Sequence, residues 1–148
     1  MGPQVSVRLE AAADPACGES YPFALARVEK QTEQPHQPPY LVSFAETIRS
    51  IVSDAGRGVP AGLISARFHN TLADVIGAAA LRAQEEQSHD TVVLSGGVFL
   101  NRTLLEKAEA RLKELGMRVL RPVLYSPNDE SISVGQIAFA LNQVRSRT

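Results

Sequence analysis

Apolar runs and helical stripes alternate most regularly in the last third of the chain. A β-branched run at residues 91–94 leads through Ser95-Gly96-Gly97 into leucines and alanines at helical spacing, which end at Gly116. A second short strand is expected at residues 117–120, and a final helix follows two prolines. The apolar face of this last helix consists of Val134, Ile137, Leu141 and Val144. Strand–helix–strand–helix order predicts parallel strands joined by right-handed crossovers.

The first two thirds of the chain predict helices mixed with short strands. Residues 4–13 fit a helix, which we favour, although apolar residues there also alternate as in a strand. Apolar and aromatic runs at residues 21–28 and 40–44 predict strands. Helical periodicity begins at Ser43 and stops at two glycines, and a longer helix follows Pro60. The apolar stripe of this longer helix consists of Ile64, Phe68, Leu72, Val75 and Ala79.

A polar loop separates the two strands predicted in the first half of the chain. Residues 29–39 contain three prolines, three glutamines and His36, with almost nothing to bury, so we expect a mobile loop. The whole chain has 148 residues, of which 44% are hydrophobic and 21% charged. This balance is typical of a soluble globular protein, and the length predicts a single domain over residues 1–148.

The charge balance and the single cysteine argue against several classes of protein. Lysine and arginine number 15 against 16 aspartates and glutamates, so no basic excess indicates nucleic acid or an anionic membrane. Cys17 is the only cysteine, which excludes an internal disulfide and a multi-cysteine metal centre built from this chain alone. No signal-like segment opens the sequence, and no apolar stretch approaches the roughly 20 residues that cross a bilayer. We expect a cytoplasmic protein that binds neither nucleic acid nor membrane.

The glycine turn between a strand and a helix is the first candidate site. Gly96 and Gly97 follow the run at residues 91–94, and ligands of open α/β sheets bind at this end of the strands. A helix N-terminus there offers N–H groups to a phosphate. The structural alternative is that the glycines only form a tight turn and that Asn101 caps the helix. The absence of a full phosphate-loop motif favours that alternative.

Asp129 is the second candidate, on the loop that enters the last helix. It lies beside the glycine turn if the two strands are neighbours, and its carboxylate could then hold a metal bound to nucleotide phosphates. A helix-capping role is the simpler alternative. For His69, in the long helix, packing or capping is expected rather than catalysis. No two histidines have a metal-ligand spacing.

Several of these segments together resemble a known family. Ser95-Gly96-Gly97-Val98-Phe99-Leu100-Asn101, followed by Pro127-Asn128-Asp129 and Gly135-Gln136, is similar to the C-terminal end of the HypF family, the carbamoyltransferases of nickel–iron hydrogenase maturation. The resemblance extends through Ala66-Arg67-Phe68-His69-Asn70-Thr71-Leu72-Ala73 and covers nearly the whole chain. It implies one lobe of a two-lobed fold related to actin, Hsp70 and sugar kinases. Such an α/β lobe has a mixed sheet with parallel strands and flanking helices.

The resemblance also implies a reaction and a site. The family transfers a carbamoyl group, by way of a carbamoyl-adenylate, to the C-terminal cysteine of HypE, where it becomes the cyanide ligand of the hydrogenase. Gly96, Gly97 and Asn101 would bind the nucleotide, and Asp129 would bind a divalent metal. The implied cofactors are therefore ATP or carbamoyl-adenylate and that metal. No catalytic residue in the strict sense is implied within this chain.

One departure from the family pattern lies at the second motif. The family continues Asn-Asp-Gly-Gly, whereas this chain has Asn128-Asp129-Glu130-Ser131, so Glu130 brings a negative charge to a place where phosphate is expected to approach. The first lobe of the family, with its metal-binding histidine motif, has no counterpart in these residues. We therefore expect the C-terminal, nucleotide-facing lobe of a HypF-type carbamoyltransferase. It would be inactive alone and would act with the missing lobe or domains and a HypE-type partner.

Two other functional hypotheses remain open. The chain could be a non-catalytic module that keeps the fold of the lobe and binds a protein, a reading that Glu130 favours. It could also be a free-standing nucleotide-binding domain, which the lack of a complete phosphate motif disfavours. In either form, a lobe without its neighbour is expected to expose an apolar face, through which two copies could form a homodimer.

Overall fold

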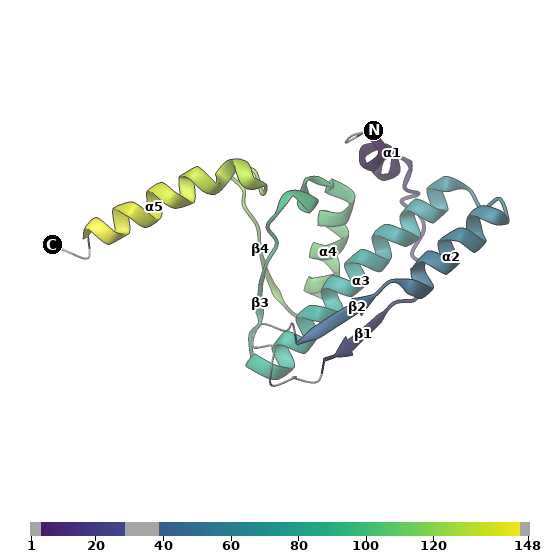
Figure 1. Ribbon diagram of the computed structural model, residues 1–148, viewed down its shortest axis with the longest axis horizontal. Helices are drawn as coiled ribbons and strands as arrows, with labels where there is room; N and C mark the ends of the chain where they lie inside the picture. Colours follow the sequence, from purple (N-terminus) through teal and green to yellow (C-terminus); the bar gives the residue numbers. More distant parts are fainter. Residues whose placement is uncertain (1–3, 29–38, 146–148) are drawn as a thin grey trace.

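The computed structural model describes residues 4–28 and 39–145, which form an α/β structure dominated by helices (Figure 1). The helices are α1 (Gln4–Ala12), α2 (Ala45–Gly56), α3 (Ala61–Gln87), α4 (Arg102–Glu114) and α5 (Ile132–Arg145). The strands are β1 (Ala24–Arg27), β2 (Tyr40–Ser43), β3 (Thr91–Val93) and β4 (Arg118–Leu120), and the short 3-10 turns are η1 (Gly97–Leu100) and η2 (Asp129–Ser131). The loop expected to be mobile, residues 29–39, lies outside the described residues except for Pro39.

The unit formed by β3, α4 and β4 positions the glycine turn. β3 and β4 pair in parallel, with Val92 opposite Val119, which confirms the prediction from the alternating pattern. α4 connects the two strands, and Gly116 ends it with a positive φ of 77°. The core of the unit consists of Leu94, Ala108, Leu112 and Met117. Because the strands are parallel, their C-terminal ends lie at the same edge of the pair.

α3 is the central helix, and its buried face differs from the predicted one. The predicted stripe of Ile64, Phe68, Leu72, Val75 and Ala79 is only half-buried or exposed, so this prediction was wrong. The buried residues are small or polar, namely Ser65, Ala66, His69, Thr71, Ala73 and Gly77. The reason is that α1, α2, β1 and α4 all contact α3, which leaves little room for large side chains. A Cβ added at Gly77 would lie 3.1 Å from Arg111 Cγ of α4 and 3.1 Å from Cδ1 of Leu115, the residue that follows α4.

β1 and β2 form a separate antiparallel pair, and β1 contacts α3. Ala24 lies opposite Ser43, and Arg27 lies opposite Tyr40. The mixed sheet expected for the lobe is therefore divided into two pairs, because no described strand hydrogen-bonds to both. The helix favoured for the N-terminal segment is confirmed as α1, which packs against α3.

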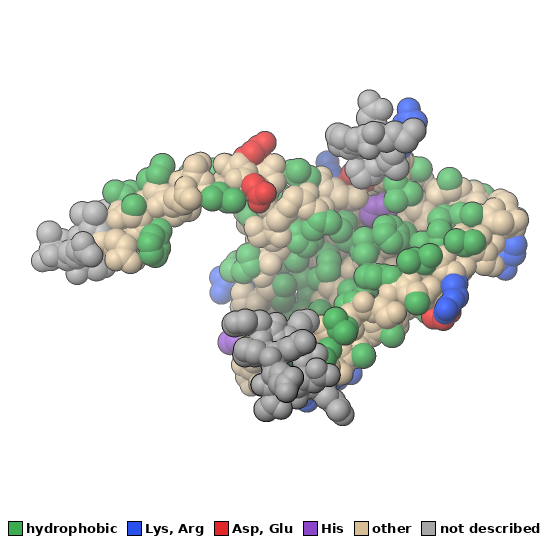
Figure 2. Space-filling model, viewed as in Figure 1, with side chains coloured by type: hydrophobic (Ala, Val, Ile, Leu, Met, Phe, Trp, Pro, Cys, Tyr) green, Lys and Arg blue, Asp and Glu red, His purple; other side chains and the backbone are tan. Residues whose placement is uncertain are grey.

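Apolar surfaces remain uncovered in the described part of the chain, as expected for a lobe without its neighbour. α5 extends away from the other elements (Figure 1), and every residue from 132 to 143 is exposed. Hydrophobic side chains also gather over β2, α2 and the adjoining part of α3 (Figure 2). The exposed ones on β2 and α2 are Leu41, Val42, Ile48 and Val52. Within residues 4–28 and 39–145, no helix is long and apolar enough to cross a membrane.

The contact between the end of α1 and the start of α3 leads to a first testable expectation. A Cβ at Gly62 would lie only 2.8 Å from the backbone oxygen of Ala12, which cannot move aside as a side chain would. Alanine favours a helix by about 1 kcal/mol over glycine, but the shift of α1 should cost about 1–3 kcal/mol. We expect Gly62→Ala to lower the melting temperature in thermal denaturation.

Gly56→Ala is the matched control, because Gly56 is also helical and an added Cβ there meets no atom within 4 Å. We expect that variant to be neutral or slightly more stable. An equal response of both variants would contradict the close packing of α1 on α3.

Candidate functional site

The C-terminal ends of β3 and β4 border a cavity of about 480 Å³. Three segments line it, namely the turn after β3, the loop after β4 and the start of α5. Its polar lining includes Ser95, Ser126, Asn128, Asp129 and Ser131. Gly96 N donates a hydrogen bond of 2.7 Å to Pro127 O, which fastens the turn to the loop. The two motifs found in the sequence therefore meet at one end of the strand pair.

Gly96 gives this cavity an open backbone wall. Its φ of +109° lies in the region that favours glycine, and an added Cβ would meet no atom within 4 Å. Gly97 lies next to the lining, because its added Cβ would be 3.9 Å from Asn128 Cβ. The space and the small hydroxyl side chains suit a phosphate-bearing ligand. The Gly96 N–H is already bonded to Pro127, so the turn offers room for close approach rather than a cluster of free donors.

Asn101 does not line the cavity, because its side chain points into the fold. Its Oδ1 accepts a hydrogen bond of 2.8 Å from Leu104 N, which makes it the N-cap of α4. Its Nδ2 lies 2.9 Å from His69 Nε2. The capping role considered from the sequence is confirmed, and contact with a nucleotide stays a prediction.

Asp129 is exposed at the rim of the cavity, at the first position of η2. Asn128, not Asp129, caps this turn, since Asn128 Oδ1 accepts a hydrogen bond of 3.1 Å from Glu130 N. Among the described residues, no group of three or more His, Cys, Asp or Glu side chains could hold a metal ion. These residues do not make a metal site by themselves. Asp129 could supply one oxygen, and the remaining ligands would have to be phosphate oxygens or other groups.

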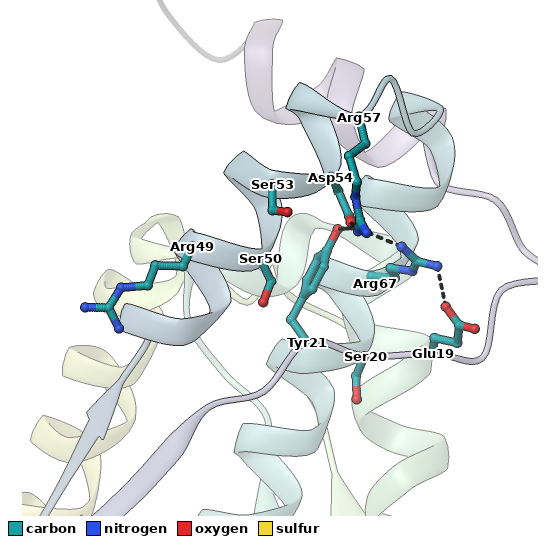
Figure 3. Close-up of a pocket in the computed structure, with 9 residues that line it drawn as sticks. All are labelled: Glu19, Ser20, Tyr21, Arg49, Ser50, Ser53, Asp54, Arg57 and Arg67. Atoms are coloured by element: carbon teal, nitrogen blue, oxygen red, sulfur yellow. Dashed lines mark hydrogen bonds and ion pairs between the residues drawn. The ribbon is translucent and has the colours of Figure 1, made fainter.

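A second cavity, of about 540 Å³, lies between α2, α3 and the segment before β1 (Figure 3). Its centre is the buried carboxylate of Asp54. Tyr21 Oη donates to Asp54 Oδ2 over 2.9 Å, Arg67 donates to the same oxygen over 2.7 Å, and Arg57 donates to Oδ1. Figure 3 shows Arg57 and Arg67 directed toward Asp54, whereas Arg49 points away from it.

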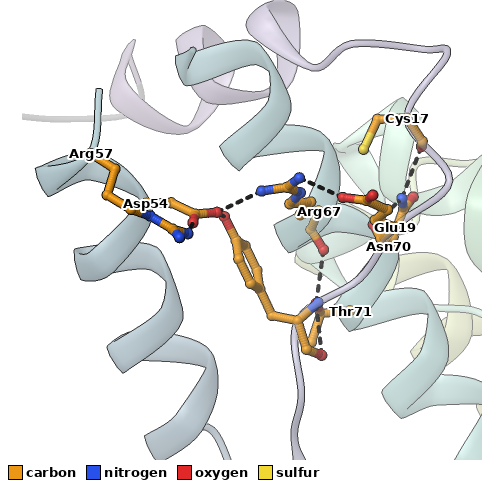
Figure 4. Close-up of polar contacts among 8 residues, drawn as sticks. Cys17, Glu19, Asp54, Arg57, Arg67, Asn70 and Thr71 are labelled. Atoms are coloured by element: carbon orange, nitrogen blue, oxygen red, sulfur yellow. Dashed lines mark hydrogen bonds and ion pairs between the residues drawn. The ribbon is translucent and has the colours of Figure 1, made fainter. Parts of the chain in front are cut away.

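The same cluster attaches the segment before β1 to α3 (Figure 4). Arg67 also bonds to Glu19, and Asn70 Nδ2 donates to the backbone oxygens of Cys17 and Glu19 over 3.0 and 2.7 Å. Thr71 Oγ1 accepts a hydrogen bond of 2.8 Å from the backbone N of Tyr21. These contacts hold an irregular segment in place and explain why polar residues of α3 are buried.

Electrostatics keep the central carboxylate of this cluster ionised. Hydrogen bonds from Arg57 and then from Tyr21 hold the pKa of Asp54 below its ordinary value. Burial, followed by the hydrogen bond to Asp54, raises the pKa of the Tyr21 phenol. A neutral phenol and an ionised, fully bonded carboxylate are expected at neutral pH. This arrangement is suited to a structural clamp rather than to proton transfer.

Sequence reasoning missed the Asp54 cluster, because most of its contacts are long-range. Asp54 and Arg57 are three residues apart on one helix, a spacing that could have suggested an ion pair. Tyr21 and Arg67 lie 33 and 13 residues from Asp54 along the chain, and no local pattern connects them. The arginines of α4 form surface ion pairs, Arg102 with Glu106 and Arg111 with Glu114, and Arg111 also pairs with Asp74 of α3.

The chain has recognisable relatives. Residues 3–136 match a family model described as "Carbamoyltransferase, Kae1-like Domain, second subdomain". The chain belongs to this family. The crystal structure of full-length HypF in its phosphate- and nucleotide-bound form is similar to this Kae1-like subdomain, with a TM-score of 0.80 and 29% identity. The match covers 92% of this chain and 17% of that chain, which confirms both the resemblance to HypF and the α/β lobe.

Two kinds of carbamoyl- or threonylcarbamoyltransferase are similar in sequence to this chain. A tRNA N6-adenosine threonylcarbamoyltransferase of Prochlorococcus marinus (strain MIT 9303) is 32% identical over 131 residues, covering 83% of this chain and 36% of that protein. Carbamoyltransferase HypF2 of Cupriavidus necator is 34% identical over 94 residues, covering 64% of this chain and 11% of that protein. The chain therefore spans only a minor part of the length of these relatives.

Proposed function

We propose that the chain forms the nucleotide-facing half of a carbamoyl-transfer site of the HypF type. The observation that carries this proposal is the cavity at the ends of β3 and β4, where Gly96 leaves the backbone open and Asp129 lies at the rim. The similar HypF structure holds phosphate and nucleotide, which supports a nucleotide role for the same lobe here.

The reaction would transfer a carbamoyl group from a carbamoyl-adenylate, made from ATP, to a cysteine. The acceptor would be the C-terminal cysteine of a HypE-type maturation protein, on the route to the cyanide ligand of a hydrogenase. The cysteine sulfur would bond to the carbamoyl carbon while the bond from that carbon to the phosphate oxygen breaks, and AMP would leave. A bound divalent metal would neutralise phosphate charge.

The residues of this chain account for only part of such a site. Gly96 and Gly97 would let the phosphates approach, Asn101 would hold the turn in place, and Asp129 would supply one metal ligand. Asp129 is the only carboxylate among the cavity-lining residues, and no lysine or histidine is among them. A base that accepts the thiol proton, and the other metal ligands, must therefore come from elsewhere. We propose that the chain does not turn over alone.

The uncovered apolar surfaces indicate where a partner would bind. Ile137, Phe139 and Leu141 of α5 are 61%, 66% and 60% exposed, which is unusual for a helix in water. We propose that the first subdomain of the same enzyme, on this or another polypeptide, covers these side chains. Without it, a second copy of the chain could cover them and form a homodimer. We place this assembly in the cytoplasm, where a lone thiol such as Cys17 stays reduced.

One observation favours a second candidate function, that of a non-catalytic binding module. Glu130 is exposed directly beside Asp129, and its negative charge would repel a phosphate in the adjoining cavity. A lobe that has lost phosphate binding could still present its apolar surfaces to a protein.

Nucleotide binding by the isolated chain tests the proposed site. Because only half of the cleft is present and Glu130 repels phosphate, we expect calorimetry with ATP and magnesium to show weak binding or none. At millimolar ATP, NMR shift changes should be confined to residues 95–97 and 126–131. ATP-dependent shifts around the Asp54 cavity instead would contradict the placement of the site. Low-micromolar binding that is lost in Asp129→Ala would show that the chain binds nucleotide without a second lobe.

A further inference from the structure

A row of hydrogen bonds runs through the interior from α1 to the start of α4. The hydroxyl of Ser65 donates to the backbone oxygen of Leu9, so α1 is joined to α3. One helical turn later, His69 Nδ1 lies 2.8 Å from Ser65 O, and His69 Nε2 lies 2.9 Å from Asn101 Nδ2. Asn101 Oδ1 then accepts from Leu104 N over 2.8 Å. The row ends at the residue that closes η1, the turn that starts at Gly97.

The bonding partners of His69 select one tautomer of its ring. Leu104 N is a donor only, so it must face the oxygen of the Asn101 amide, and the NH₂ group of Asn101 must face His69. His69 Nε2 therefore accepts a hydrogen bond and carries no proton. The other ring nitrogen, Nδ1, carries the proton and donates it to Ser65 O. His69 is 2% exposed and uses both of its ring nitrogens.

These contacts argue against two simpler roles. His69 cannot act as a general base on a ligand in the cavity, because it is buried and its only lone pair is occupied. Asn101 already uses its amide oxygen and one of its two N–H donors inside the fold, which favours an anchoring role over direct contact with a nucleotide. A side chain that packs only by its apolar surface would not require the Nδ1–H tautomer that this row of bonds selects.

The nucleotide-facing turn is thus fastened at both of its ends. At the first end, Gly96 N bonds to Pro127 O. At the second end, Asn101 is held by His69, and the neighbouring Thr103 N donates to Glu10 Oε1 of α1 over 3.2 Å. Two otherwise unpaired N–H groups at the start of α4 are satisfied in this way, one by Asn101 and one by α1.

We propose that His69 is a positioning residue for the nucleotide-facing turn, acting through Asn101 by the neutral Nδ1–H tautomer. Asn101 serves nucleotide binding by anchoring Gly97–Leu100 to α3, not by touching the nucleotide. This inference rests on the proposed function only for its effect on nucleotide binding. Its structural part, the coupling of His69 to the turn, holds independently of any ligand.

The test is a double-mutant cycle on the full chain, with His69→Leu, Asn101→Ser and the double variant. Amide hydrogen exchange at Leu104 and Phe99 reports on the cap and on η1, where Phe99 N bonds to Gly96 O over 3.1 Å. A buried neutral hydrogen bond contributes roughly a factor of 5 to 10 to such an equilibrium. We expect His69→Leu to speed exchange at both amides by about that factor and to add almost nothing in the Asn101→Ser background.

His69→Gln is the matched control, because its amide oxygen can accept the Asn101 hydrogen bond. In this variant we expect amide exchange rates at Leu104 and Phe99 within about twofold of those of the unsubstituted chain. Additive effects of His69→Leu and Asn101→Ser, or no rescue by His69→Gln, would overturn the proposal and leave His69 a packing residue. If His69→Leu does not fold, His69→Asn replaces it in the cycle, since the shorter side chain loses Asn101 but keeps a polar group near Ser65 O.

A second readout separates this inference from the proposed function. The same variants are assayed for ATP binding with the first subdomain of a HypF-type enzyme added. Coupled losses of exchange protection and of ATP affinity are expected. If the variants lose exchange protection together but ATP affinity is unchanged, the His69–Asn101 coupling stands. Its role in nucleotide binding is then refuted, and the result counts against the proposed site.

Discussion

Adding the first subdomain of a HypF-type enzyme in trans is expected to produce carbamoyl transfer to a HypE-type C-terminal cysteine, and Asp129→Ala should remove most of it. In the proposed function, the cavity at the ends of β3 and β4 forms one side of a two-lobed cleft, and a nucleotide bound between the lobes would stabilise their association by mass action. Asp129 is its only lining carboxylate, so in the proposed site its loss would remove a metal ligand and, through the metal, the stabilisation of phosphate charge. Losses of this kind are about a hundredfold or more in rate.

Two further variants make this experiment specific. Asp90→Ala is the matched control, because Asp90 is an exposed carboxylate next to the opposite end of β3, and we expect unchanged transfer. Glu130→Gly should raise activity, since it removes a repelling charge and restores close backbone approach. If the two pieces associate stably but transfer stays at background even with Glu130→Gly, the chain is better explained as a binding module.

Asp54→Ala is expected to cause the largest loss of stability among single substitutions in the first half of the chain. The carboxylate is 5% exposed and joins α2, α3 and the segment that carries Tyr21. Its removal leaves Arg67, whose side chain is 22% exposed, without its buried partner and leaves the Tyr21 hydroxyl without an acceptor. Removing one member of a buried charged pair is strongly destabilising, and we expect the melting temperature to fall by on the order of 10 °C.

Acid denaturation gives an independent signature of the same cluster. The pKa of Asp54 is lowered in the folded state, chiefly by the hydrogen bond from Arg57. Its contribution to stability is therefore fully present above the unfolded pKa of about 4 and is lost as pH falls through the lower, folded pKa. Asp54→Ala should lack this loss of stability below about pH 4, although it is less stable throughout.

Glu46→Ala is the control for a surface ion pair of the same helix. Glu46 and Arg49 are 62% and 71% exposed, and such pairs contribute little. We expect a shift within about 2 °C. Similar melting temperatures for Asp54→Ala and Glu46→Ala would contradict the clamp inferred from the structure.

The β3–α4–β4 unit and the place of the candidate cavity could be predicted from the sequence. A β-branched run, a helical stripe and terminal glycines are local signals, and parallel strands with a helical crossover leave few ways to arrange them. The order of these elements alone therefore predicted that Gly96 and Asp129 lie at the same end of the strand pair, where both line the cavity. The sequence also indicated that Asn101 could cap α4, because an N-cap bonds to a backbone N–H within the next three residues.

Which side of α3 is buried, and what its polar residues contact, depends on how the other elements pack against it. Periodicity identifies an amphipathic helix, but it assumes one buried face, whereas α3 is contacted by α1, α2, β1 and α4. Small and polar residues are buried where neighbouring backbones come close and supply hydrogen-bond partners. The polar residues of α3 bond to partners that are far away in the sequence. Asp54 lies 33 residues from Tyr21 and 13 residues from Arg67, and His69 lies 32 residues from Asn101. Such partners are chosen by how the elements pack against one another, and no local pattern in the sequence encodes that choice.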